Sequence, residues 1–198
     1  MPEIVFQEEG HIYTVDGKGV PSVTTIIKEC GLINMTWFTF VYDGAATRGT
    51  YVHQATELLD RDDLDETSLD PALIPYVEAY KRFKQDTGFC INDIEKIVYN
   101  ATYGYAGTLD RVGKFPGDSI ESIIDIKTGK PEKWHGLQLA AYRLCLGNEL
   151  RKRFGLYLSD SGIYRLERYT DRQDIQVFLA CLTIYKFKEA TCSRQPKL

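Results

Sequence analysis

Short apolar runs with a period of two open the chain and predict β-structure near its start. The apolar run 4–6 and the segment 11–15, in which apolar and polar residues alternate, together predict a short hairpin. Residues 16–19 carry two glycines and predict a turn. Ser22 then precedes the apolar run 23–27, and because serine is a good N-cap, a first helix is predicted there.

Two longer helical patterns follow. One extends from about Trp37 to Asp60, and the other begins at Asp70-Pro71 and ends at Gly88, a residue type that readily closes a helix. The second pattern places large apolar residues on one face, namely Tyr76, Ala79, Tyr80 and Phe83. The acidic block 57–70 is interpreted as a solvated surface loop.

The middle of the chain is rich in strand-like patterns. Three strands are predicted, over 91–99, 104–113 and 120–127, with a hairpin turn at 114–118 between the second and the third. A helix from about Lys133 to Arg153 follows them.

Towards the C-terminus the pattern predicts a hairpin of two strands, 154–158 and 162–169, and then a helix over 172–190. A helix, a three-stranded meander and a helix that crosses to further strands indicate an α/β or α+β fold. We therefore expect a central mixed sheet of about five strands flanked by helices, in a single domain that covers residues 1–198.

The composition is that of an ordinary globular protein, with 43% hydrophobic and 26% charged residues. No apolar run is long enough for a transmembrane helix, and the first residues lack the features of a secretory signal. The five cysteines are widely spaced without a C-x-x-C pair, which disfavours a zinc ribbon or a disulfide framework. These features favour a reducing cytoplasm, and no membrane partner is expected.

The net charge of −4 is unevenly distributed along the chain. Segment 57–70 holds seven acidic residues and one basic residue, whereas segment 127–153 holds seven basic and two acidic ones. The local balances are therefore −6 and +5. This asymmetry permits a phosphate-binding groove near the basic segment despite the acidic net charge.

Two short segments carry the most informative chemistry. Gly107-Thr108-Leu109-Asp110 lies in one predicted strand, and Asp125-Ile126-Lys127 closes the next. Side chains two apart in a strand point to the same face, so Asp125 and Lys127 project together. Carboxylates suit Mg²⁺, and an ammonium beside them is placed to orient water and to stabilise charge on a phosphate. A structural salt bridge between Asp125 and Lys127 is the alternative interpretation.

The order of these motifs resembles the PD-(D/E)XK nuclease superfamily, in particular its RecB-like exonuclease branch, which includes phage exonucleases and the mitochondrial genome maintenance exonuclease. In that branch a helix carries a histidine, a strand carries G-x-x-D, the next strand carries (D/E)-x-K, and the following helix carries Q-x-x-x-Y. The corresponding parts here are His53, Asp110, Asp125-Ile126-Lys127 and Gln138-Leu139-Ala140-Ala141-Tyr142. The resemblance covers roughly 20–145, with the core motifs at 48–142, and implies a restriction-endonuclease-like core and metal-dependent hydrolysis of DNA.

The resemblance also implies the members of a metal site. The expected catalytic residues are Asp110, Asp125 and Lys127. The expected metal ligands are His53, Asp110, Asp125 and the backbone carbonyl of Ile126, with Glu95 as a further candidate. Mg²⁺ is the expected cofactor, and an imidazole ligand makes Mn²⁺ a competitor. Glu57 lies one helical turn after His53 and is placed to hydrogen-bond the imidazole.

DNA contacts are expected along the helix that follows the D-x-K strand. Gln138 and Tyr142 are four residues apart and share one helix face, and the resemblance implies that this face lines the active site. Arg48, Lys130 and Lys133 are candidate phosphate contacts, with ordinary surface positions as the alternative. The aromatic candidates for stacking on single-stranded bases are Trp37, Phe38, Phe40 and Trp134.

Two features differ from patterns within the superfamily. Leu109 stands where the family's name has a proline, a change that removes no ligand. Some relatives bind an iron–sulfur cluster through one early and three closely spaced late cysteines. Here Cys181 and Cys192 are eleven residues apart with no cysteine between them, so no cluster is expected.

These observations favour an exonuclease that acts on single-stranded or duplex DNA ends. The expected setting is phage or prophage recombination, or DNA repair, in the cytoplasm of a bacterial or phage-infected cell, with a single-strand annealing protein as a candidate partner. A structure-specific endonuclease is one alternative, because its sheet and site would be the same. A catalytically inactive DNA-binding module is another. The sequence leaves the polarity, the strand preference and the oligomeric state open.

Overall fold

The computed structural model describes residues 2–33, 43–147 and 150–192. Within these ranges the strands are β1 (Ile4–Gln7), β2 (Ile12–Val15), β3 (Lys18–Val20), β4 (Cys90–Asn100), β5 (Tyr105–Lys114), β6 (Ser122–Lys127), β7 (Lys152–Leu158) and β8 (Tyr164–Arg168). The helices are α1 (Val23–Glu29), α3 (Asp43–Asp60), α4 (Ile74–Thr87), α5 (Lys133–Cys145) and α6 (Asp174–Cys192), with a 3-10 helix at Glu66–Ser68. No helix in these ranges is long and apolar enough to cross a membrane. Three of the predicted stacking residues, Trp37, Phe38 and Phe40, lie outside the described residues.

A small antiparallel sheet is formed by β1, β2 and β3. The predicted hairpin is confirmed, whereas part of the predicted turn pairs with β2 as the third strand, β3. The turn itself is confined to Asp16 and Gly17, which both adopt positive φ angles. Ser22 caps α1 as predicted, because its hydroxyl accepts the N–H of Thr25 at 3.0 Å.

The five remaining strands form a second sheet in the order β4-β5-β6-β7-β8. Neighbouring strands are antiparallel except β6 and β7, which are parallel. A parallel pair needs a crossover connection, and α5 lies in the connection between these two strands. The prediction of a mixed sheet of about five strands flanked by helices is therefore confirmed.

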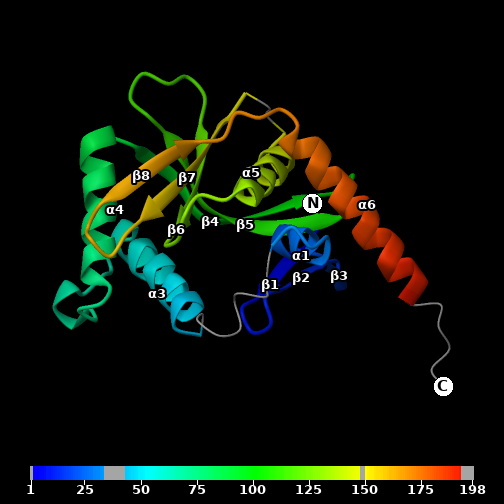
Figure 1. The fold of residues 1–198 in the computed structure, drawn as a ribbon, viewed down its shortest axis with the longest axis horizontal. Coiled ribbons are helices and arrows are strands. Elements are labelled where there is room, and N and C mark those ends of the chain that lie inside the picture. Colours follow the sequence, from blue (N-terminus) through cyan, green and yellow to red (C-terminus); the bar gives the residue numbers. More distant parts are fainter. Residues whose placement is uncertain (1, 34–42, 148–149, 193–198) are drawn as a thin grey trace.

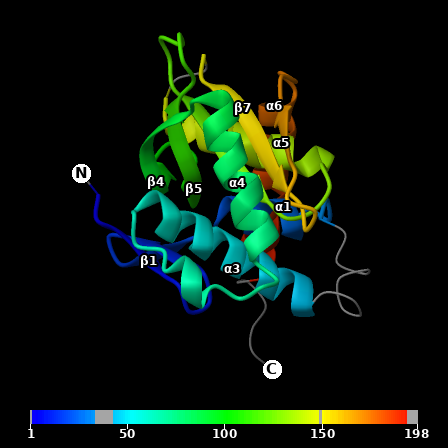
Figure 2. The same cartoon turned by 90° about the vertical axis from the view of Figure 1, so that its left-hand side faces the viewer.

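Helices cover both faces of this sheet (Figure 1). α3 and α4 lie over one face, and Figure 2 shows them in front of the strands. α1, α5 and α6 cover the opposite face. Each face buries its own apolar core, and alternation along β6 assigns Ile123 to the core beneath α1, α5 and α6, and Ile124 with Ile126 to the core beneath α3 and α4.

The helix predicted over 133–153 is too long. α5 ends at Cys145, and Gly147 beyond it adopts a φ of 65°, which favours glycine and stops the helix. β7 then begins at Lys152 and pairs in parallel with β6. The strand predicted over 154–158 is therefore confirmed but starts two residues earlier, with the charged residues Lys152 and Arg153, which fall at the end of the predicted helix.

The interpretation of 57–70 as one solvated loop is also wrong. Its first residues form the last turn of α3, and the Asp60 side chain at the end of that turn is 1% exposed. Asp60 is buried because it forms ion pairs with Arg111 and Lys84. α4 begins at Ile74 rather than at Asp70, whose carboxylate accepts the N–H of Ala72 in the preceding turn.

Candidate active site

Three acidic residues lie in one row across β4, β5 and β6. In the β4–β5 register Ile94 pairs with Arg111 and Lys96 pairs with Leu109, so Glu95 lies opposite Asp110. The β5–β6 register pairs Arg111 with Ile124, so one further step brings Asp110 beside Asp125. The row lies where the pairing of β5 with β6 ends, so the carboxylates gather at the point where two strands separate.

His53, Glu95 and Asp110 form a group that we call the ligand set. Each offers one donor atom, and the three atoms lie within 4.8 Å of one another. His53 comes from α3, and its Nδ1 is 3.5 Å from Oδ2 of Asp110. One imidazole and two carboxylates suit a divalent cation such as Mn²⁺ or Mg²⁺. Asp125, predicted as a ligand, lies beside this set rather than within it.

Glu95 has an unusual backbone for a strand residue. Its φ is 47°, in the left-handed region that non-glycine residues rarely adopt. Such a conformation costs roughly 1–3 kcal/mol and is concentrated at functional sites. Burial, followed by the negative charge of Asp110, raises the pKa of Glu95 to about 8, although Arg111 opposes the shift. The strand therefore holds the Glu95 carboxylate where its negative charge is unfavourable, and a bound cation would offset that cost.

Asp110 also connects β5 to the backbone of β6. Its Oδ2 accepts the N–H of Ile126 at 2.5 Å, in place of the strand pairing that has ended. The N–H and C=O of one strand residue point to the same edge of the strand. The carbonyl of Ile126 therefore also faces β5, and its role as a metal ligand stays a prediction.

Asp125 and Lys127 project from the same face of β6, as their spacing predicts. Nζ of Lys127 is 2.6 Å from Oδ2 of Asp125 and 5.6 Å from the ring centre of Trp134. Burial raises the pKa of Asp125 to about 6, against the effect of Lys127. Burial also acts to lower the pKa of Lys127, but Asp125 and Asp110 outweigh it and raise that pKa, so Lys127 is a cation at neutral pH.

A groove of about 1180 Å³ contains the ligand set and the Asp125–Lys127 pair. Gln138 and Tyr142 also line it, and Nε2 of Gln138 donates to the Tyr142 hydroxyl at 3.2 Å. The Gln138 carbonyl oxygen is buried without a hydrogen-bond partner among the described residues, so it is available to a ligand. Gly107 makes this packing possible, because a Cβ there would lie 2.5 Å from the Tyr142 ring.

The basic residues that the sequence predicts as DNA contacts are divided between the groove and other surfaces. Arg48 and Lys130 line the groove, whereas Lys133 is exposed at the start of α5 outside it. Glu57 forms an ion pair with Arg61 at 2.9 Å, so its carboxylate bonds to this guanidinium rather than to His53.

The basic segment 127–153 contributes less to the groove than its charge predicts. Three of its cations are held in ion pairs away from the site, namely Arg151 with Glu121, Lys152 with Asp118 and Arg153 with Asp174. Among the described residues, the positive charge of the groove comes from Lys127 and Lys130 of this segment and from Arg48 of α3.

Two site residues are not predicted from the sequence. His135 is 4% exposed in the groove, and its Nδ1 accepts the N–H of Glu132 at 3.1 Å and lies 2.7 Å from the Tyr157 hydroxyl. Burial, and then the charge of Lys127, lower its pKa to about 3, so the ring is neutral. Arg111 is the second such residue. A charged side chain directly after Asp110 in a mostly apolar strand indicates that its charge is buried and paired, and this signal could have identified Arg111.

No protein-family model matches the chain, and no curated protein matches it by sequence. Among solved structures, a candidate exonuclease from Eubacterium rectale matches with a TM-score of 0.53 and 13% identity, over 71% of this chain and 65% of that chain. The alkaline exonuclease LHK-Exo from Laribacter hongkongensis matches more loosely, with a TM-score of 0.37, 17% identity, and coverage of 73% of this chain and 85% of that chain. Its complex with dAMP gives a TM-score of 0.43 and 16% identity, over 87% and 89%. The first likeness shows a shared fold, and this chain spans 65% of that neighbour's length.

Proposed function

We propose that this protein is a divalent-metal-dependent DNA exonuclease that hydrolyses phosphodiester bonds from DNA ends. One observation carries the proposal: the three donor atoms of the ligand set lie within 4.8 Å of one another in the groove that also contains the Asp125–Lys127 pair. The fold shared with a candidate exonuclease supports it. We further propose that the chain belongs to the RecB-like branch of the PD-(D/E)XK nucleases.

His53, Glu95 and Asp110 would hold the cation, and the neighbouring Asp125 and the Ile126 carbonyl remain the further ligands that the sequence predicts. A bound divalent cation supplies positive charge that activates water and offsets charge on a phosphate. Mg²⁺ prefers oxygen ligands alone, whereas Mn²⁺ accepts an imidazole more readily. We therefore propose Mg²⁺ as the physiological cofactor and Mn²⁺ as an effective substitute.

Lys127 acts as a fixed cation rather than as a general base, because its raised pKa keeps it protonated. Asp125, 2.6 Å away, holds the ammonium in place. From this position Lys127 orients the attacking water and stabilises negative charge that develops on the phosphate. The Gln138 carbonyl oxygen, which has no hydrogen-bond partner in the described part of the chain, would supply an acceptor at the wall of the same groove.

The positively charged groove residues Arg48 and Lys130 would contact the DNA backbone. We place the activity in phage or prophage recombination or in DNA repair, in the cytoplasm of a bacterial or phage-infected cell. Enzymes that resect DNA ends leave single strands, so an annealing protein is the proposed partner.

Digestion of end-labelled linear DNA, single-stranded and duplex, beside a closed circular plasmid tests the proposal. The reactions contain Mg²⁺, Mn²⁺ or EDTA, and the Lys127→Met variant is the inactive control. Metal-dependent loss of the linear DNA with an intact circle is expected, and the order of label release gives the polarity. Cleavage of the circle would instead establish an endonuclease, and binding without cleavage by either metal would establish a DNA-binding module.

A further inference from the structure

Arg111 is a buried cation beside the ligand set for which the proposed chemistry has no role. It is 1% exposed and directly follows Asp110 in β5. Its register partner Ile124 packs in the core beneath α3 and α4, so Arg111 extends towards those helices. A buried arginine is unfavourable unless its charge and its donors are matched, so its partners indicate what it does.

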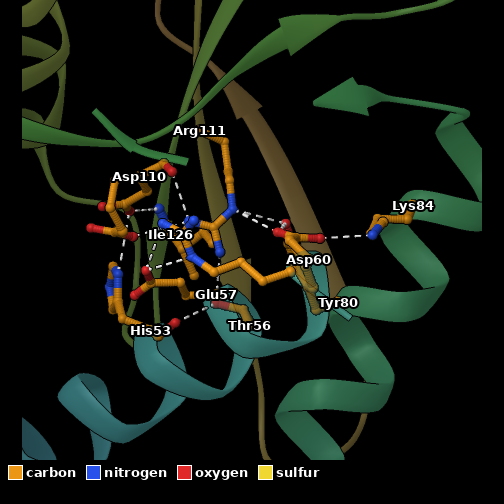
Figure 3. Close-up of polar contacts among 11 residues, drawn as sticks. His53, Thr56, Glu57, Asp60, Tyr80, Lys84, Asp110, Arg111 and Ile126 are labelled. Atoms are coloured by element: carbon orange, nitrogen blue, oxygen red, sulfur yellow. Dashed lines mark hydrogen bonds and ion pairs between the residues drawn. The ribbon is translucent and has the colours of Figure 1, made fainter. Parts of the chain in front are cut away.

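All three guanidinium nitrogens of Arg111 donate to the surrounding elements (Figure 3). Nε donates to Oδ2 of Asp60 at 2.7 Å, and Nη2 donates to the Thr56 hydroxyl at 3.3 Å. Nη1 donates to Oε1 of Glu95 at 3.0 Å and to the backbone carbonyl of Asp110 at 2.7 Å. One planar group therefore contacts α3, β4 and β5, the three elements that carry the ligand set.

The α3 residues near Arg111 lie on one face of that helix. His53, Thr56 and Asp60 are three and four residues apart, so they point to the same side of α3. Arg111 bonds to the last two, and His53 lies in the preceding turn, so Arg111 contacts the helix face that also carries the imidazole.

Asp60 is in turn held by α4. Its Oδ2 accepts the Tyr80 hydroxyl at 2.5 Å, and its Oδ1 accepts from Nζ of Lys84 at 2.7 Å. Figure 3 shows Asp60 between Arg111 and these two side chains. The carboxylate that anchors Arg111 is therefore fixed from two helices.

We propose that Arg111, anchored by Asp60, is a positioning residue that holds the His53-bearing helix and the strained Glu95 strand at the separation that metal binding requires. The planar guanidinium suits this role because it makes these bonds at once, whereas a lysine ammonium could not span them. The inference rests on the proposed metal-binding function.

Arg153 offers a matched control. It is also 1% exposed and also lies on a strand of the same sheet. It forms an ion pair with Oδ2 of Asp174 at 2.8 Å and donates hydrogen bonds to the backbone carbonyls of Gly136 and Asp171, and none of these partners belongs to the ligand set. Replacement of either arginine should destabilise the fold, but only replacement of Arg111 should alter the geometry of the ligand set.

The test compares Mn²⁺ binding to the wild-type protein and to Arg111→Lys, Asp60→Asn and Arg153→Lys, by calorimetry below each variant's unfolding temperature. The expected results are about 10–100-fold weaker binding for Arg111→Lys, weaker binding also for Asp60→Asn, and wild-type affinity for Arg153→Lys. Asp60→Asn preserves the side-chain shape and carries the test if Arg111→Lys does not fold. Wild-type affinity in the folded Arg111 and Asp60 variants would overturn the proposal, as would an equal loss in Arg153→Lys.

The same measurement separates this inference from the proposed function. Glu95→Gln and Asp110→Asn alter the ligand set itself, so both must weaken Mn²⁺ binding if the metal site exists. If the wild-type protein binds no Mn²⁺, or if these two variants bind it normally, the metal site is wrong and both proposals fail. If only the Arg111 and Asp60 variants bind normally, the positioning role alone fails.

Discussion

The two halves of the candidate site are built in different ways. The ligand set takes one residue from each of α3, β4 and β5; Glu95 has a strained backbone, and the buried Arg111 is hydrogen-bonded to all three elements. The second half, which we call the β6–α5 segment, is the continuous stretch 125–142 with Asp125, Lys127, Gln138 and Tyr142. The first half depends on long-range register, whereas the second depends on strand alternation and helical spacing within one stretch of chain.

This difference implies a division of roles. Under the proposed function, metal binding would depend mainly on the assembled half, which remote substitutions can disturb. Water orientation and substrate contact would depend on the local half, which stays in place as long as β6 and α5 form. Substitutions in the two halves should therefore have separable effects on metal affinity and on turnover.

The largest effect is expected from a direct test of that separation. Asp110→Asn should remove both Mn²⁺ binding and hydrolysis, because it takes a charged oxygen from the ligand set. Lys127→Met should leave Mn²⁺ binding within a few-fold of wild type but lower kcat at least about 10²–10³-fold, the typical cost of losing one group that stabilises transition-state charge. Calorimetry and single-turnover digestion measure the two properties. Equal loss of metal affinity in both variants would contradict the division of roles.

Measurements at different pH values test the protonation of Glu95 in the ligand set. The folded protein raises the pKa of Glu95 to about 8 through burial and the nearby Asp110, so the carboxyl keeps a proton that the unfolded chain releases near its ordinary value of 4.5. The folded state therefore binds more protons than the unfolded state across this window, and the stability of the metal-free protein should fall as the pH rises through about 8. Mn²⁺ affinity should rise over the same range, because the metal needs the carboxylate.

Glu95→Gln should remove most of both pH dependences. Its metal-free melting temperature at pH 9 should exceed that of the wild type, while stabilisation by Mn²⁺ should be largely lost. Thermal unfolding from pH 5 to 9, with and without Mn²⁺, measures both. An unchanged pH profile in this variant would mean that Glu95 is not the group that titrates.

A smaller effect is expected from Gln138→Leu in the β6–α5 segment. The wild-type carbonyl oxygen is buried without a partner among the described residues, so its removal relieves a desolvation cost, whereas loss of the Nε2 donor to the Tyr142 hydroxyl opposes this gain. The unfolding temperature should therefore change little, while kcat/KM on DNA falls about tenfold because a substrate contact is lost. A loss of stability with unchanged kcat/KM would show that Gln138 has a structural role.

The smallest effect is expected from the two lysines before and at the start of α5. Lys130 lines the groove and Lys133 does not, although three positions separate them. Lys130→Ala should weaken DNA binding and reduce the slope of log affinity against log salt by about 0.7–0.9, the contribution of one phosphate contact. Lys133→Ala is the matched control and should leave the slope unchanged. Equal slopes for the two variants would place the DNA outside the groove.

Much of the fold and half of the site follow from local patterns in the sequence. Alternation over Ser122–Lys127 predicts that Asp125 and Lys127 face together, and the four-residue spacing of Gln138 and Tyr142 predicts one shared helix face. The three strands of the meander, the cap at Ser22 and the central mixed sheet follow in the same way. These features could be predicted because they depend on residues close together in the chain.

Other features were decided by the tertiary structure. Glu95 became part of the ligand set because the β4–β5 register places it opposite Asp110, and sequence spacing does not specify a register between strands. Asp60 stands in an acidic block that suggests solvent exposure, yet its ion pair with Arg111 buries it. β7 begins at Lys152, inside the segment predicted as helix, because Lys152 and Arg153 pair with β6 over a long range that the helical pattern does not contain. Periodicity determines which side of its own element a residue faces, but packing across the sheet determines which other elements it meets.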